Sequence, residues 1–171
     1  ELWGIADRTD YDLSVHQKHS GENLEYLDPE TNEKYLPYVI EPSLGVERLL
    51  LAVLTSAYEE ETLSDGETRE VLHFDPRVAP VKVAILPLVN KLNDKALELY
   101  QMLKKYFVCE YDSSGKIGKR YRRQDAIGTP YCLTVDFETL ENNSVTLRNR
   151  DSMEQFRINI DDLLKYLNDK F

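Results

Sequence analysis

The sequence predicts an α/β fold for residues 81–171, in which a mixed five-stranded sheet is covered by three helices. The first observation is the order of the expected elements, βαβαβββα, because strands that alternate with helices are typical of a sheet with parallel neighbours. The second is composition: 42% of the 171 residues are hydrophobic and 30% are charged, which suits a globular chain that can bury a core. The third is a change from acidic to apolar residues near residue 80, which indicates a domain boundary there.

The first part of the chain is predicted to be a separate piece that ends near residue 57. Residues 1–40 mix short apolar runs with acidic turns, which is typical of strands joined by exposed loops. Residues 44–57 have almost no polar face, so we expect a helix that is buried nearly all round. Residues 58–70 contain six acidic residues and one arginine, which predicts a solvated linker, assigned here to residues 58–80.

The elements of the second part follow from hydrophobic periodicity and from turn residues. Residues 81–89 are apolar and β-branched, which indicates a strand buried on both faces. Asn93 can cap a helix whose apolar residues recur at helical spacing. The later elements are a strand at 108–111, a helix at 116–127 ended by Gly128 and Pro130, strands at 131–137, 145–148 and 156–160, and a helix at 163–171.

Composition and charge exclude several classes of protein. No apolar run approaches the ~20 residues that a membrane helix needs, and no signal-peptide pattern opens the chain. Cys109 and Cys132 lie far apart in apolar runs, which argues against a disulfide scaffold and favours the reducing cytoplasm. Residues 1–80 hold 18 acidic and 6 basic residues, whereas residues 81–171 hold 13 and 15. The acidity that would repel nucleic acid therefore belongs to the first half.

One group of potential metal ligands is interpreted as structural, and no metal site is expected. Its members alternate along the sequence in a way that suits a strand edge. They are Asp7, Asp10, Asp12, His16 and His19.

The stretch from Glu41 to Arg48 is the first candidate site. Arg48 would stand in the first turn of an apolar helix, where a guanidinium group is costly unless it meets an anion in a wet cleft. Gly45 allows close approach of the backbone, and the positive end of a helix favours phosphate. These residues indicate a triphosphate site, although an ion pair between Arg48 and Glu47 would explain the same pattern.

Three blocks, in the same order, resemble the glycine-specific family of class II aminoacyl-tRNA synthetases. Residues 41–48 read EPSLGVER and are similar to the strand-to-helix element called motif 3. Residues 1–16 resemble the segment before that motif, and residues 112–121 (DSSGKIGKRY) and 145–151 (VTLRNRD) resemble the anticodon-binding domain. The resemblance implies the C-terminal part of such an enzyme, in which the end of an antiparallel-sheet catalytic domain precedes the linker and a complete anticodon-binding domain.

The resemblance also implies roles in the first block. Arg48 would be the catalytic residue, because it contacts the phosphates of ATP, which enters with Mg²⁺. A carboxylate such as Glu41 can select an ammonium group by a charge-assisted hydrogen bond, and Ser43 beside the substrate α-carbon would exclude larger amino acids sterically. The implied ATP-binding residues are Glu1, Leu2, Gly45, Val46, Glu47 and Arg48. The implied glycine-binding residues are Glu41, Pro42, Ser43, Leu44 and Gly45.

A second candidate site is the basic stretch 116–123, which holds five cations and no acid. We expect a helix that packs by its apolar edge and turns the cations to water, which by itself is often only a solvated face. The resemblance implies that this region binds the anticodon, whose splayed bases are read by aromatic stacking and by edge hydrogen bonds. The implied anticodon-binding residues are Arg120, Tyr121, Arg123, Phe137, Arg148, Arg150 and Asp151.

The implied function of the whole enzyme is ATP-dependent attachment of glycine to its tRNA through a glycyl-adenylate, by a cytoplasmic homodimer without membrane contact. Motifs 1 and 2 of the family do not occur in these residues, so we expect this chain alone to be inactive in adenylation. Two alternatives would share the second fold. A synthetase for proline, threonine or histidine is disfavoured by the EPS element, and a non-catalytic polymerase accessory factor need not keep Glu47 and Arg48.

Overall fold

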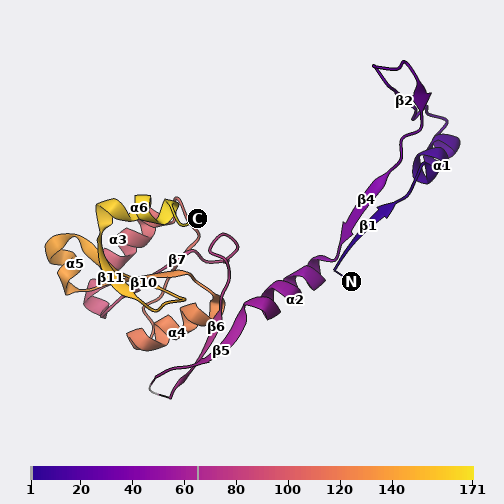
Figure 1. The fold of residues 1–171 in the computed structure, drawn as a ribbon. Helices are drawn as coiled ribbons and strands as arrows, with labels where there is room; N and C mark the ends of the chain where they lie inside the picture. The colour runs from indigo at the N-terminus through magenta and orange to yellow at the C-terminus, as the bar shows by residue number, and fades with distance from the viewer. Residues whose placement is uncertain (1, 65) are drawn as a thin grey trace. The chain divides into compact units, whose positions relative to one another are not determined.

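A computed structural model describes residues 2–64 and 66–171 (Figure 1). Contacts along the chain define two compact units, Glu1–Ala52 and Val53–Phe171. Among the described residues, no helix combines the length and the apolar character that crossing a bilayer requires.

The first unit is built on a two-stranded antiparallel ladder. Strand β1 (Trp3–Asp7) pairs with β4 (Ile40–Leu44), and in this register Gly4 lies opposite Ser43. The elements between these strands are α1 (Tyr11–Ser20), β2 (Tyr26–Leu27) and β3 (Lys34–Tyr35).

Helix α1 replaces the strand edge that the sequence predicted. Asp12, His16 and His19 all lie in this helix, which ends at Gly21 in the left-handed conformation with φ 75°. No residue of α1 is buried, and its sequence lacks the apolar stripe at helical spacing that would have predicted a helix. The aspartates and histidines were therefore assigned the two-residue period of a strand.

Helix α2 (Val46–Ala57) forms where the sequence predicted it, but the expected burial on all sides is wrong for the described residues. Leu50 is 58% exposed and Leu51 is 65% exposed, and Ala57 is the single residue of α2 classed as buried. An apolar run predicts a helix from its length and composition, whereas burial depends on partners that the run does not encode.

The acidic segment after α2 is a β-hairpin, where the sequence predicted a solvated linker. Strands β5 (Tyr58–Thr62) and β6 (Thr68–Leu72) pair antiparallel, and β6 packs against helix α4 (Ile117–Ile127) of the second unit. Arg69 and Val71 are completely buried. In β6 these two buried residues alternate with the exposed Thr68 and Glu70, so the overall composition concealed a half-buried strand.

The second unit contains the predicted five-stranded mixed sheet, which confirms the fold class. Its strands lie in the order β11-β10-β9-β7-β8, with β7 parallel to β8 and β9, and β10 antiparallel to β9 and β11. The strands are β7 (Val83–Pro87), β8 (Cys109–Tyr111), β9 (Tyr131–Val135), β10 (Ser144–Asn149) and β11 (Gln155–Asn159).

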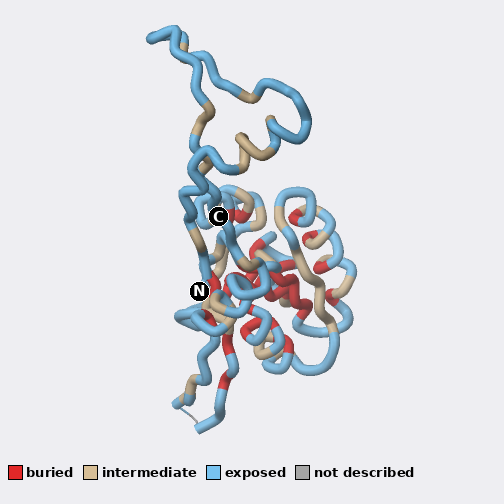
Figure 2. Tube along the Cα trace, turned by 90° about the vertical axis from the view of Figure 1, so that its right-hand side faces the viewer, coloured by how far each residue is buried: buried red, intermediate tan, exposed pale blue. Residues whose placement is uncertain are grey.

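Helices cover both faces of this sheet (Figures 1 and 2). Val83 and Ile85 of β7 pack with the buried residues of α3 and α6, whereas Ala84 and Leu86 pack towards Ile117 and Tyr121 of α4. The helical elements are the 3-10 turn Asn90–Leu92, α3 (Asn93–Leu103), α4, α5 (Phe137–Asn142) and α6 (Ile160–Asn168). The short helix α5 was not predicted.

Candidate nucleic-acid interface and nucleotide groove

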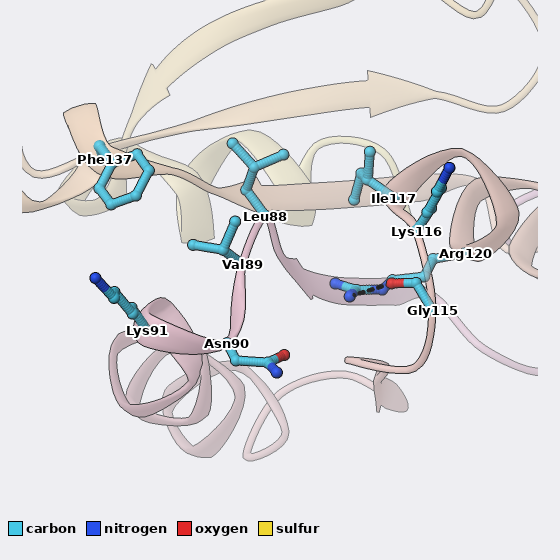
Figure 3. A pocket seen from close by; sticks show the side chains of 9 residues that line it. All are labelled: Leu88, Val89, Asn90, Lys91, Gly115, Lys116, Ile117, Arg120 and Phe137. Carbon is cyan, nitrogen blue, oxygen red and sulfur yellow. Dashed lines mark hydrogen bonds between the residues drawn. The ribbon is translucent and has the colours of Figure 1, made fainter.

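The connectivity of the second unit creates a crevice at the carboxyl end of β7. The chain leaves β7 through α3 to β8 on one side and returns through α4 to β9 on the other, so β7 is the point where the direction of winding reverses. Ligands of open α/β sheets bind outside the carboxyl ends of strands at such a point. A cavity of about 800 Å³ lies here, lined by Leu88, Val89, Asn90, Lys91, Gly115, Lys116, Ile117, Arg120 and Phe137 (Figure 3).

An aromatic ring and two lysines give this crevice its chemical character. Phe137 is the first residue of α5 and is 53% exposed, and it stands beside Lys91 at one end of the cavity (Figure 3). Lys116 lies at the other end, immediately before α4, and is also exposed. An exposed ring in a crevice that also carries ammonium groups can stack on a base while the cations bind phosphates. Phe137 was predicted from the sequence, but Lys91 was not.

Arg120 lies at the inner wall of the crevice, where it holds the backbone. Its side chain is buried, and its guanidinium group donates to the carbonyls of Ser113 at 2.8 Å, Gly115 at 2.6 Å and Pro87. The expectation that all five cations of residues 116–123 face water is therefore wrong for Arg120. The guanidinium instead ties the end of β7 to the loop before α4, and this gives Arg120 a positioning role.

Arg123 and Tyr121 are more accessible than Arg120. Arg123 donates from Nε to Asp112 at 2.9 Å and from Nη2 to the carbonyl of Ser114 at 2.7 Å, and its side chain stays 46% exposed. The hydroxyl of Tyr121 lies 2.5 Å from that of Thr134. Burial raises the pKa of the Tyr121 phenol above its usual value.

Two further predicted anticodon residues lie inside the fold. Arg148 forms a bidentate pair with Asp125, at 2.7 and 3.0 Å, and Arg69 reaches the same buried carboxylate at 3.3 Å. Arg150 donates to the carbonyls of Gly128 and Phe74 at 2.8 and 2.7 Å. The alternation of residues along β10 predicts which side chains share a face of the sheet, but it does not predict which face other elements bury.

Arg150 also pairs with Asp151, the last predicted anticodon residue. Nε of Arg150 lies 2.7 Å from Oδ1 of Asp151, and the Asp151 side chain remains 48% exposed. Partial burial by itself would raise the pKa of Asp151, but hydrogen bonds from Arg150 and His73 outweigh it and hold this pKa below its usual value. The geometry thus leaves Phe137, Tyr121, Arg123 and Asp151 accessible, and gives Arg120, Arg148 and Arg150 interior partners.

A second, smaller hollow lies in the first unit, at the junction of β4 and α2. It encloses about 310 Å³ and is lined by Leu2, Trp3, Gly4, Ser43, Leu44, Gly45 and Arg48. The amide of Leu49 donates to the carbonyl of Gly45 at 2.9 Å, so α2 starts at this hollow and directs its positive end there. Val46 and Glu47 form the first turn of the helix. Five of the predicted ATP-binding and glycine-binding residues therefore meet around one hollow: Leu2, Ser43, Leu44, Gly45 and Arg48.

The predicted ammonium-binding residue Glu41 has a different partner. Its carboxylate lies 3.2 Å from Nε of Arg8, which also pairs with Asp12. In the β4 strand Glu41 lies two residues from Ser43, so both share one face of the ladder, while Pro42 lies on the opposite face. Glu1 lies outside the described residues.

Comparisons with known proteins identify one family and several relatives. A protein family described as "Anticodon binding domain" matches residues 82–170. The glycine–tRNA ligase of Clostridium tetani is 65% identical over 170 residues, which cover 99% of this chain and 37% of that protein. The enzyme of the same name from Clostridium acetobutylicum is 62% identical, with the same coverage.

The chain thus spans little more than a third of the length of the curated relatives that it matches. A solved structure, the RNA binding domain of threonyl-tRNA synthetase from Cryptosporidium parvum, is similar to 86% of this chain and 35% of that one with a TM-score of 0.66. Its sequence identity is 21%, so it supports the fold alone.

Proposed function

Because the chain belongs to the anticodon-binding domain family through residues 82–170, we propose that its second unit binds a tRNA anticodon in the crevice at the carboxyl end of β7. The observation that carries this proposal is the exposed ring of Phe137 beside Lys91, with Lys116 at the other end of the same crevice, at the reversal point of the sheet. Stacking on such a ring holds an unpaired base, and the neighbouring cations hold the backbone.

The buried arginines contribute to this site by positioning it. Arg120 fixes the loop that carries Lys116, and Arg148 holds helix α4 through Asp125. We propose that base edges are contacted by the exposed Arg123 and the partly exposed Tyr121, since guanidinium groups donate to base acceptors. Asp151 is left out of these contacts, because it follows Asn149, which pairs with Tyr131 at the amino end of β7 and β9. This reduces the predicted set of direct contacts without removing the three interior arginines from the site.

The experiment that tests the interface is filter binding of the 171-residue chain to glycine tRNA. Phe137→Ala should weaken binding about 5- to 150-fold, because one stacked base contributes about 1–3 kcal/mol. The matched control is Tyr106→Ala, which removes an aromatic ring of similar exposure from the segment after α3. Equal losses in both variants, or no loss in either, would contradict the proposed crevice.

For the longer protein we propose glycine–tRNA ligase activity: ATP activates glycine as glycyl-adenylate, and the glycyl group is then transferred to tRNA. The proposal is supported by relatives of that name at 59–65% identity over nearly the whole chain. We further propose that the protein acts as a homodimer in the cytoplasm.

The hollow of the first unit has donors that fit the triphosphate of ATP, which would bind as its magnesium complex. It combines the guanidinium of Arg48, the hydroxyl of Ser43 and the amino end of α2. In the proposed reaction Arg48 offsets the negative charge that develops on the departing pyrophosphate, while Ser43 limits the space for a substrate side chain. Gly45 has no side chain, which allows the phosphates to approach the backbone.

Two measurements test this part of the proposal. In the full-length protein, Arg48→Ala should lower ATP–pyrophosphate exchange with glycine by about 10²–10³-fold, the usual cost of losing one donor to transition-state charge. The 171-residue chain alone should show no exchange above background. Exchange that persists in the Arg48→Ala variant would refute the assigned role of Arg48. Exchange with the 171-residue chain alone would refute the expected dependence on the rest of the protein.

A further inference from the structure

Outside both candidate sites, one face of the β5–β6 hairpin carries a group of side chains with complementary chemistry. In the antiparallel register Glu59 lies opposite Val71 and Glu61 opposite Arg69. The amide of His73 donates to the carbonyl of Ala57 at 2.7 Å, so the ladder continues by one more pair. Because side chains alternate along a strand, Glu59, Glu61 and His73 share one face.

Both nitrogens of the His73 ring face carboxylate oxygens. Nδ1 lies 2.6 Å from Oδ1 of Asp151, and Nε2 lies 3.0 Å from Oε1 of Glu61 and 3.5 Å from Oε2 of Glu59. A neutral imidazole has one N–H donor, so it can satisfy only one of these two sides. The second side needs another positive group, either a second proton or a metal ion.

The surrounding charges leave a negative excess near Nε2. The other oxygen of Glu61, Oε2, accepts from Nε of Arg69 at 2.8 Å, which directs Oε1 towards His73. Arg150 neutralises Asp151 on the far side of the ring. The Glu59 carboxylate faces Nε2 of His73 and remains 63% exposed.

We propose that Glu59, Glu61 and His73 form a binding site for a divalent transition-metal ion such as Zn²⁺. The three ligand atoms all lie within 4.8 Å of one another. In a tetrahedral site with metal–ligand bonds of about 2.0–2.1 Å, neighbouring ligand atoms are about 3.3 Å apart. Nε2 of His73 lies 3.0 Å from the Glu61 carboxylate and 3.5 Å from that of Glu59, which is close to this spacing.

Asp151 completes the arrangement, since it accepts the Nδ1 proton and so directs the Nε2 lone pair towards the metal. A mixed imidazole and carboxylate set favours Zn²⁺ over Mg²⁺, which prefers oxygen ligands alone. When Zn²⁺ binds, Nε2 carries no proton, and any proton present there passes to the buffer.

The test is calorimetric titration of the chelator-treated 171-residue chain with ZnCl₂ at pH 7.5. One ion should bind per chain, and His73→Gln should weaken binding at least about tenfold. Glu59→Gln should weaken it as well. The matched control is Glu60→Gln, which changes a carboxylate on the opposite face of the same strand. Binding that is equal in Glu59→Gln and Glu60→Gln would overturn the proposal.

Further variants in the same titration test the site even if His73→Gln perturbs folding. The double variant His16→Gln and His19→Gln removes the other histidines of the chain and should bind Zn²⁺ as the original chain does. Asp151→Asn should lower the affinity about 10- to 100-fold. Loss of binding in the double variant, displacement of Zn²⁺ by equimolar Mg²⁺, or no heat of binding up to millimolar ZnCl₂ would each refute the site.

Discussion

Replacement of Asp125 is expected to be the most damaging single change in the second unit. Its carboxylate is completely buried and pairs with Arg148 at 2.7 and 3.0 Å and with Arg69 at 3.3 Å. Asp125→Ala leaves the Arg148 guanidinium buried without its charged partner, whereas Arg69 keeps Glu61. Removing one partner of a buried ion pair costs about 3–5 kcal/mol. For a unit of this size, that corresponds to a fall in melting temperature of about 10–20 °C.

Urea denaturation at pH 7, followed by far-ultraviolet circular dichroism, measures this loss. Asp125→Asn keeps the shape of the side chain and one carbonyl acceptor, so it should be less damaging than Asp125→Ala. The control is Glu98→Ala, which removes an exposed partner of Lys95 on α3 and should cost less than about 1 kcal/mol. A loss below about 1 kcal/mol for Asp125→Ala would refute the claim that this carboxylate holds helix α4 to the sheet.

Three further changes test individual features of the second unit. Gly128→Ala should destabilise the unit by about 1–3 kcal/mol more than Gly115→Ala in thermal unfolding: both have positive φ, but only at Gly128 would a Cβ lie 2.5 Å from the Phe74 ring. Desolvation raises the pKa of Cys132 to about 12, so thiol labelling at pH 8 should be negligible until urea unfolds the unit, and rapid labelling of the native chain would contradict this burial. The folded-state pKa of Asp151 lies below 3.8, so its carboxylate stabilises the fold above that pH and loses this effect as the pH falls through the folded value. The melting temperature of Asp151→Asn should therefore depend less on pH below 4 than that of the unchanged chain, and identical pH profiles would refute the linkage.

The second unit was predictable because its periodicities are strong. Every residue of β7 and β9 is buried, and both runs are short and apolar between turn residues. Helix α5 was missed because it has only six residues, and its signal is local: Asp136 and Thr139 form a reciprocal capping box. The hairpin was missed because acidic composition outweighed the alternation that places Arg69 and Val71 inside.

The candidate sites were predictable to different degrees. A sequence shows that residues 116–123 are basic, but not that Arg120 turns inward to four backbone carbonyls. Arg148 and Arg150 match an anticodon-binding pattern, yet their partners Asp125 and Gly128 come from the end of α4 and its cap, and only the folded chain brings these together. The crevice itself arises from the order of the strands, which element patterns leave open.

The central claim is that the crevice beside β7 reads the anticodon of glycine tRNA by its bases. Filter binding across a salt series, with glycine tRNA and with a variant in which the two cytosines shared by glycine anticodons are replaced, tests it most directly. We predict that the replacement weakens binding at least about tenfold at every salt concentration, because lost base contacts do not depend on counterion release. Equal affinities for the two tRNAs throughout the series would show that the chain binds only the phosphate backbone, and would contradict the account.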